Sequence, residues 1–282
     1  MTAHAEIAET HAGVHHDTAA GIGFLRRPAN GPALVLLHGI GSNARSFLPT
    51  IAALPAAIDA IAWNAPGYAG SAALASATPA PQDYAAALRD FLDALGLRRI
   101  VLAGHSLGAL FAARFAADHP DRVAALALLS PALGYRVAKG AALPDTVQSR
   151  IDEIAALGPQ AFAAKRAARL VGDAAGRPDV VDAVRTAMAS VDPAGYAQAV
   201  HALGAGDLIA DAARITVATC VAVGTHDVIT PPDNARAAYA ALKNPAGFHD
   251  IARAGHALPQ EQPGEMAIVL AELIRDRTHV ES

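Results

Sequence analysis

The sequence predicts an α/β domain in which a mostly parallel sheet, covered by helices on both faces, is interrupted by a helical insertion. Short apolar runs alternate with helix-like stretches at both ends of the chain, as in parallel strands joined by crossover helices. The 282 residues are 53% hydrophobic and 17% charged, which favours one large compact fold. No buried strand is expected between 135 and 206, so 1–134 and 207–282 are assigned to the core and 135–206 to the insertion.

The first half of the core is organised by short apolar runs. Residues 1 to about 10 are expected to be mobile, and an antiparallel pair of strands is expected at about 11–16 and 20–26. Continuous apolar runs, typical of strands buried on both faces, occupy 33–37, 60–63, 100–103 and 123–129. Helices are expected between them at 44–54, 83–95 and 107–117.

The insertion and the second half of the core complete this order. Pro and Gly residues separate four expected helices of the insertion, at 145–157, 159–171, 178–190 and 193–203. The alternation then resumes with a strand at 215–223, a helix at 232–242, a short strand at 247–251 and a final helix at 264–277. Functional sites of such sheets lie at the carboxyl ends of the strands, where the chemically informative residues of this chain also fall.

Charge and apolar patterning exclude several classes of protein. The net charge of −4 provides no basic surface for nucleic acid. The single cysteine, Cys220, excludes an internal disulfide, and its apolar neighbours favour a buried, inert thiol. No apolar stretch approaches the ~18 residues that span a bilayer, and the N-terminal residues do not form a secretory signal. We therefore expect a cytoplasmic protein without a membrane partner. The histidines between 4 and 16 lack a fixed ligand spacing and are interpreted as a solvated leader, with weak metal binding as the alternative.

The pentapeptide Gly-His-Ser-Leu-Gly at 104–108 stands between an expected strand and an expected helix. A Gly-x-Ser-x-Gly in this setting is typical of the nucleophile elbow, a sharp strained turn that exposes the serine hydroxyl. Side chains at the two flanking positions would clash across the turn, which explains both glycines. Ser106 is therefore the candidate nucleophile, and an ordinary glycine-rich turn with a bystander serine is the alternative.

The turn after the strand at 33–37 fits two motifs. Residues 39–44, Gly-Ile-Gly-Ser-Asn-Ala, match the dinucleotide-binding pattern, and Asp59 follows at the spacing of its ribose-binding acid. In that motif the acid stands at the end of the next strand, where this chain has Asn64, whereas Asp59 precedes the strand. We favour the second interpretation, in which the turn presents a backbone N–H to an oxyanion. Ile40 and Leu107 are the two candidate donors.

A serine hydroxyl needs a base within hydrogen-bond reach, and the base needs an orienting acid. The candidate base is His256, in a Gly-His loop between the last short strand and the final helix. The candidate acid is Asp227, which follows the strand at 215–223 and gives the chain order Ser, Asp, His. Residues of the same types with simpler expected roles are Asp233 (helix N-cap), Asp250 (strand or loop), His226 (loop), His249 (strand) and His279 (tail).

Together these residues resemble the α/β-hydrolase superfamily over nearly the whole chain. The resemblance is carried by the His-Gly turn at 38–39, the elbow serine, the acid after Gly-Thr-His and the Gly-His loop. The stretch 63–71 is similar to the superfamily's Pro-Gly-x-Gly-x-Ser loop, with Ala69 as an extra residue. A serine nucleophile excludes the haloalkane dehalogenases and epoxide hydrolases. The chain most resembles 3-oxoadipate enol-lactonases and meta-cleavage product hydrolases, and this implies that 135–206 form a lid over the site.

The resemblance implies a serine hydrolase of small carboxylic esters or lactones that forms an acyl-enzyme without a metal or organic cofactor. Its partner is a small molecule with a carbonyl. C–C bond hydrolysis of ring-fission products, amide hydrolysis and acyl transfer are alternatives on the same triad, and a non-enzymatic binding protein is a third class. In the lid, Arg166 and Arg169, next to Lys165, either form a solvated helical face or bind a substrate carboxylate. Ser42 and Asn43 either contact the substrate or cap a helix.

Overall fold

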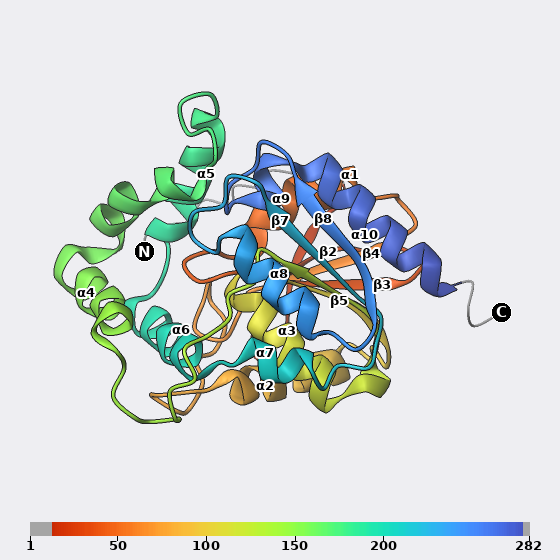
Figure 1. Cartoon of the computed structure of the whole chain (residues 1–282), viewed down its shortest axis with the longest axis horizontal. Helices are drawn as coiled ribbons and strands as arrows, with labels where there is room; N and C mark the ends of the chain where they lie inside the picture. Colours follow the sequence, from red (N-terminus) through yellow and green to blue (C-terminus); the bar gives the residue numbers. More distant parts are fainter. Residues whose placement is uncertain (1–12, 279–282) are drawn as a thin grey trace, which may run out of the picture.

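The computed structural model describes residues 13–278. The strands in this range are β1 (His15–Ala19), β2 (Ile22–Arg27), β3 (Ala33–Leu37), β4 (Asp59–Trp63), β5 (Ile100–His105), β6 (Val123–Leu129), β7 (Thr219–Gly224) and β8 (Pro245–Ile251). They form one sheet of order β1-β2-β4-β3-β5-β6-β7-β8 (Figure 1). Strands β3 to β8 are parallel, and β2 is antiparallel to both β1 and β4. The mostly parallel sheet predicted from the sequence is confirmed.

Helices cover both faces of the sheet (Figure 1). On one face lie α1 (Leu48–Ala53), α9 (Leu258–Glu261) and α10 (Pro263–Thr278), and on the other α2 (Pro81–Ala94), α3 (Leu107–Asp118), α7 (Leu208–Ala212) and α8 (Pro232–Ala241). Alternate residues of β3 face the two layers: Leu34 and Leu36 join the apolar cluster under α1 and α10, and Val35 and Leu37 join the cluster under α2 and α3. Burial on both faces explains the continuous apolar runs of the central strands.

The insertion contains α4 (Asp145–Arg166), the 3-10 turn η3 (Ala167–Leu170), α5 (Pro178–Ala189) and α6 (Pro193–Ala205), at the left of Figure 1. The break predicted between the helices at 145–157 and 159–171 is confirmed inside α4, where Gly158 has the non-helical φ of 72° and ψ of 161°, but the second helical segment ends at Arg166 and continues as η3. The chain leaves and rejoins the core at one place, because a Cβ on Gly134 would lie 2.1 Å from the Gly206 carbonyl oxygen. The division at 134 and 207 remains a prediction.

Several predicted bounds are wrong for local reasons. The helix at 44–54 is a 3-10 turn, η1 (Ala44–Phe47), followed by α1. The apolar run at 215–223 begins in the turn that follows α7, where the Ile215 N–H bonds the Asp211 carbonyl, and the strand starts only at Thr219. The extra Ala69 is accommodated in a left-handed conformation, φ 44°. The first predicted strand lies at 15–19, and residues 1–12 lie outside the described range.

Two further predictions concern single features of the described chain. Cys220 is buried in β7, and burial raises the pKa of its thiol to about 12, which agrees with an inert side chain. None of the helices within residues 13–278 combines the length and the hydropathy needed to cross a membrane.

Candidate active site

Ser106 lies at the turn between β5 and α3, in the strained backbone conformation φ 54°, ψ −114°. The glycines on either side make this turn possible. A Cβ on Gly104 would lie 2.3 Å from the Gly108 carbonyl oxygen, and a Cβ on Gly108 would lie 2.2 Å from the Leu37 carbonyl oxygen. The predicted clash at both flanking positions is therefore present, and strand, helix and neighbouring β3 approach one another only because these residues are glycine.

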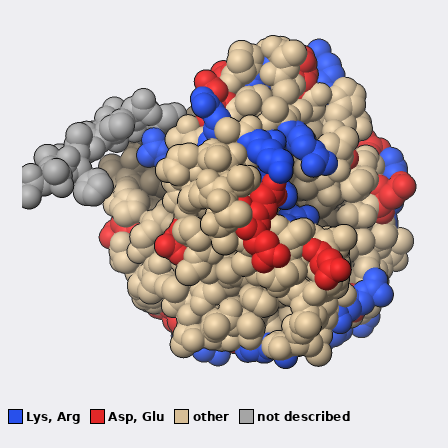
Figure 2. Space-filling view, turned by 90° about the vertical axis from the view of Figure 1, so that its left-hand side faces the viewer, with Lys and Arg blue, Asp and Glu red and all other residues tan. Residues whose placement is uncertain are grey.

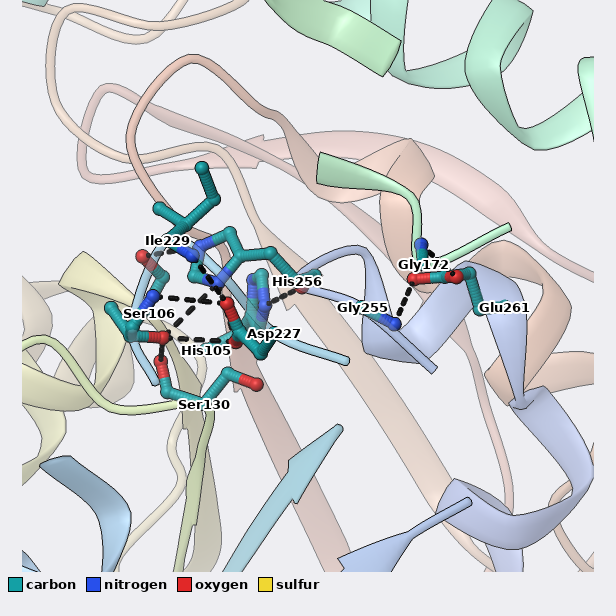
Figure 3. Close-up of polar contacts among 10 residues, drawn as sticks. His105, Ser106, Ser130, Gly172, Asp227, Ile229, Gly255, His256 and Glu261 are labelled. Carbon is teal, nitrogen blue, oxygen red and sulfur yellow. Dashed lines mark hydrogen bonds and ion pairs between the residues drawn. The ribbon is translucent and has the colours of Figure 1, made fainter. Parts of the chain in front are cut away.

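Ser106, His256 and Asp227 meet at the carboxyl end of the sheet (Figure 3). The Ser106 Oγ lies 3.0 Å from the His256 Nε2, and the His256 Nδ1 lies 2.9 Å from the Asp227 Oδ2. All three residues are at most 4% exposed. Because a carboxylate only accepts, the Nδ1 carries the ring hydrogen and the Nε2 is left to accept from the serine hydroxyl. This is the geometry of a nucleophile, a general base and an orienting acid.

The Asp227 carboxylate is held by backbone groups of the loop between β7 and α8 as well as by His256. Its Oδ1 accepts the N–H groups of Ile229 and Thr230, each at 2.9 Å. Burial raises the pKa of Asp227, but the hydrogen bond and charge of His256 and the two backbone N–H groups outweigh burial and lower it to about 2. The acid is therefore ionised over the whole neutral range.

The alternative acids and bases lie elsewhere. Asp233 is in the first turn of α8, whose N-cap is Pro231, so its expected N-cap role is wrong. Asp250 pairs with Arg236 at 3.2 Å on the surface. His249 is in β8, as expected, and His279 lies outside the described residues. Asp59, the acid of the rejected dinucleotide motif, is paired with Arg26 at 2.7 Å.

The turn at 38–41 is fixed close to the serine. A Cβ on Gly39 would lie 2.9 Å from the Ser106 Cβ, so only glycine allows this approach. The buried ring of His38 donates from Nδ1 to the Gly39 carbonyl at 2.8 Å and accepts the Ala65 N–H at Nε2, at 3.0 Å. Burial lowers the pKa of His38 to about 4, which keeps this ring neutral. Ile40, in this turn, and Leu107, the first residue of α3, both line the cavity beside the serine.

Two buried groups that the sequence analysis did not identify hold the loop of His256. His105, inside the elbow, donates from Nε2 to the His256 carbonyl at 2.7 Å. Glu261 in α9, 3% exposed, accepts the Gly255 N–H at 2.8 Å and the Gly172 N–H of the insertion at 2.7 Å (Figure 3). Burial raises the pKa of Glu261. The insertion is thus bonded to the same carboxylate as the residue that precedes the candidate base.

A cavity of about 420 Å³ opens above the serine, between the core and the insertion. Its charged wall residues, among those described, are Arg150, Arg166 and Arg169, without a carboxylate. The face that the insertion presents shows Lys and Arg side chains gathered near a hollow at its centre (Figure 2). The structure therefore brings both predicted arginines to the cavity and adds Arg150, which lies one helical segment earlier in α4 and carried no motif.

The three basic residues predicted in the lid have different surroundings. Arg166 donates from Nε to the Glu153 Oε2 at 2.8 Å, and Lys165 pairs with the same carboxylate at 2.6 Å, away from the cavity wall. The Arg166 guanidinium also stacks 4.8 Å from the Phe162 ring centre. Arg169 lies exposed at the rim. Glu153 therefore offsets part of the positive charge of the wall.

Ser42 and Asn43, the polar residues after the turn at 38–41, have different surroundings in the structure. Asn43 caps η1 by accepting the Arg45 N–H at 3.0 Å, as one of its two interpretations predicted. Ser42 lines a second, smaller cavity of about 30 Å³ that also borders His256. Within residues 13–278 no three His, Cys, Asp or Glu side chains are grouped as metal ligands would be.

Comparison with known proteins agrees with this fold. The family model described as alpha/beta hydrolase fold matches residues 32–263. A protein of Variovorax paradoxus strain S110 that carries the name carbamate hydrolase RutD is 32% identical over 237 residues, covering 82% of this chain and 86% of that protein. The enol-lactonase of Burkholderia xenovorans LB400 superposes with a TM-score of 0.81 at 22% identity, covering 93% of this chain and 100% of that one. The 2-hydroxy-6-oxo-6-phenylhexa-2,4-dienoate hydrolase of Rhodococcus sp. strain RHA1 gives 0.73 at 19% identity, covering 93% and 99%. At these identities the two structures establish the fold alone.

Proposed function

This chain belongs to the α/β-hydrolase fold family, and on that premise we propose that it hydrolyses a small carboxylic ester or lactone through an acyl-enzyme on Ser106. The observation that carries the proposal is the continuous array in which the Ser106 Oγ lies 3.0 Å from the His256 Nε2 and the His256 Nδ1 lies 2.9 Å from the Asp227 Oδ2. Nothing in this mechanism calls for a metal or an organic cofactor.

In the acylation step, the Ser106 oxygen bonds to the carbonyl carbon while His256 Nε2 takes the hydroxyl proton. Asp227 holds the imidazole by its Nδ1–H and stabilises the imidazolium. The N–H groups of Ile40 and Leu107 stabilise the developing oxyanion, each by about 2.7–4 kcal/mol. The imidazolium then gives its proton to the leaving alkoxide. Water attacks the acyl-enzyme with His256 again as base, and the serine is regenerated with release of the acid.

We further propose that the substrate bears a carboxylate. Within residues 13–278, the charged wall of the cavity consists of three arginines and no acid, and a guanidinium fork suits a carboxylate geometrically. Arg166 and Arg169 then act in binding, and α4, η3 and α5 serve as the lid that carries this wall. Ser42 would contact only a substrate group that enters the smaller cavity.

A second candidate reaction is hydrolysis of a C–N bond at a carbamate or amide. It is supported by the name of the 32% identical relative, and its carbonyl would be attacked by the same serine. C–C bond hydrolysis of a ring-fission dienoate is the other alternative, since a solved structure with that activity in its title shares the fold.

The test of the proposed function is turnover of a panel of enol-lactones, short esters, carbamates and ring-fission dienoates, with S106A as the matched inactive variant. We expect ester or lactone turnover, its loss in S106A with an unchanged melting temperature, and stoichiometric labelling of the wild type by a serine-directed phosphonate. Full activity in S106A would exclude the acyl-enzyme, and turnover of dienoates or carbamates alone would select an alternative reaction.

The carboxylate is tested separately with R166A and R169A, and with K165A as control because Lys165 lies off the cavity wall. We expect both arginine variants to raise KM for an anionic ester by about tenfold, the value of one lost charge-assisted bond. KM for a neutral ester of the same size and all values of K165A should stay within about twofold. Equal effects on anionic and neutral esters would refute the carboxylate.

A further inference from the structure

Thr230 touches the candidate acid, the candidate base and a strained carbonyl at once. Its Oγ1 lies 2.9 Å from the Ser130 carbonyl oxygen, 3.0 Å from the Asp227 Oδ2 and 3.1 Å from the His256 Nδ1. Thr230 is 6% exposed, so water does not compete freely for this hydroxyl. A hydroxyl has one hydrogen to donate, and two of these three neighbours are acceptors. Whether this hydrogen points at Ser130 or at Asp227 determines how the hydroxyl affects the Asp227 carboxylate and the His256 imidazole.

Of the two acceptors, the Ser130 carbonyl loses more without the hydrogen of the Thr230 hydroxyl. Ser130 is fully buried directly after β6, and no other donor within residues 13–278 bonds its carbonyl oxygen. A buried carbonyl without a donor costs about 1–3 kcal/mol. The Asp227 carboxylate, by contrast, already accepts two backbone N–H groups and the imidazole N–H. The hydroxyl hydrogen is therefore directed to Ser130.

The backbone of Ser130 is arranged for this contact. Its φ of 42° is in the left-handed region, which a serine adopts only at a cost, and the side-chain Oγ gains no hydrogen bond in return. What the conformation provides is a carbonyl placed beside Thr230, next to the acid and the base (Figure 3). The strained backbone of Ser130 therefore serves to orient the hydroxyl of Thr230.

With its hydrogen on Ser130, the Thr230 hydroxyl turns lone pairs toward the His256 Nδ1–H. We propose that Thr230 is a positioning residue of the triad: its oriented hydroxyl is a second acceptor, beside Asp227, for the N–H of His256. The shared hydrogen lies between the two oxygens and offsets their repulsion. This support is strongest when His256 becomes an imidazolium, because both acceptors then face a full positive charge. The expected effect of Thr230 on turnover rests on the proposed function, whereas its effect on the protonation of His256 does not.

The opposite orientation makes the opposite prediction. If the hydroxyl donated to the Asp227 Oδ2, it would withdraw charge from the carboxylate and weaken the support of the imidazolium. Removing the hydroxyl would then make His256 easier to protonate, whereas in the proposed arrangement removal makes His256 harder to protonate. The sign of one titration therefore separates the two arrangements.

The other charged and titratable groups around the imidazole give a constant background. The His105 ring lies 4.9 Å away, and burial lowers its pKa to about 3, so it stays neutral. The three arginines of the cavity wall are the same in every variant compared. Asp227, on the loop after β7, and Glu261, in α9, are also the same in all variants compared.

The experiment is an NMR titration of the His256 Cε1–H resonance in the full-length wild type, T230V and T230S. T230V keeps the shape and removes the hydroxyl, and T230S keeps the hydroxyl. We expect the T230V midpoint to fall by about half a pH unit, as for one weakened neutral hydrogen bond, and T230S to match the wild type. T230A replaces T230V should the larger apolar side chain prevent folding.

Kinetics on a neutral ester form the second readout. We expect T230V to lower kcat/KM about threefold, the fold-change that corresponds to half a pH unit, and to displace the acid limb of the pH profile to lower pH, whereas T230S restores both. A rise of the midpoint in T230V, or no change in T230V, would overturn the proposal. Because the titration needs no substrate, a wrong substrate class would leave the T230V midpoint shifted, and the two failures are distinguishable.

Discussion

Replacing Asp227 by asparagine tests the proposed mechanism most directly, because the structure dictates how the new side chain lies. The backbone N–H groups of Ile229 and Thr230 both point at the Oδ1 position, each at 2.9 Å. The amide oxygen of the introduced side chain must therefore take that position, and its NH2 group must face the His256 Nδ1. The imidazole then accepts at Nδ1 and carries its hydrogen on Nε2, where it can no longer accept the Ser106 proton.

The magnitude follows from this change of tautomer. Loss of the correctly oriented base costs about 10³–10⁴-fold in kcat, which is about 4–5.5 kcal/mol of transition-state stabilisation. Binding should survive, because Asp227 does not line the cavity. We therefore expect D227N to lose activity in kcat with KM within about threefold of the wild type, and the protein to remain folded.

The assay is turnover of a neutral p-nitrophenyl ester at about pH 7.5, with D233N and D250N as matched controls. Both controls make the same chemical change in acids on neighbouring elements, and both should stay within about twofold of the wild type. More than roughly a tenth of the wild-type kcat in D227N at an unchanged melting temperature would refute the orienting role. Loss of activity in D233N or D250N would move the acid to that position.

Three further outcomes are expected. G108A, whose Cβ would lie 2.2 Å from the Leu37 carbonyl oxygen, should lower the free energy of unfolding by about 1–3 kcal/mol in urea melts, whereas G264A should not, since its Cβ meets nothing within 4 Å. E153Q should release Arg166 and lower KM for an anionic ester about threefold, measured against a neutral ester. Burial lowers the pKa of His105 to about 3 from 6.5, so the unfolded chain takes up a proton that the folded chain refuses, and stability falls as pH drops below 6.5. H105Q should remove about 2 kcal/mol of the loss between about pH 7 and pH 5 in urea melts, and an unchanged loss would contradict this.

The parts of the molecule that sequence reasoning predicted are those where one local pattern decides the structure. Strands β3, β5 and β6 were found because burial on both faces requires unbroken apolar residues. The turn that carries the candidate serine was predicted because a five-residue glycine motif joins a strand directly to a helix. The acid and the base then followed from chain order and from the ends of the last strands.

What sequence reasoning missed depends on partners far away in the chain. Glu261 accepts backbone N–H groups, one of them from a residue 89 positions away. Every residue except proline has such a group, so no residue type in the sequence indicates this contact. Arg150 lines the cavity from the first segment of α4, but no motif distinguished it from the other basic residues of the insertion. The short helices α7 and α9 have too few residues for a periodic pattern.

The meeting of Gly134 and Gly206 makes the helical segment between them exchangeable in principle. The two ends of this segment lie in contact, so a different helical segment could be inserted between them without changing the connections of the strands or the position of Ser106. Two hydrogen bonds between the insertion and the core limit this freedom. The Gly172 N–H donates to the Glu261 carboxylate, and the Leu170 carbonyl accepts the Ala257 N–H, so any replacement segment must provide both groups. Substrate preference could thus be changed by replacing this helical segment, provided that the replacement forms both hydrogen bonds.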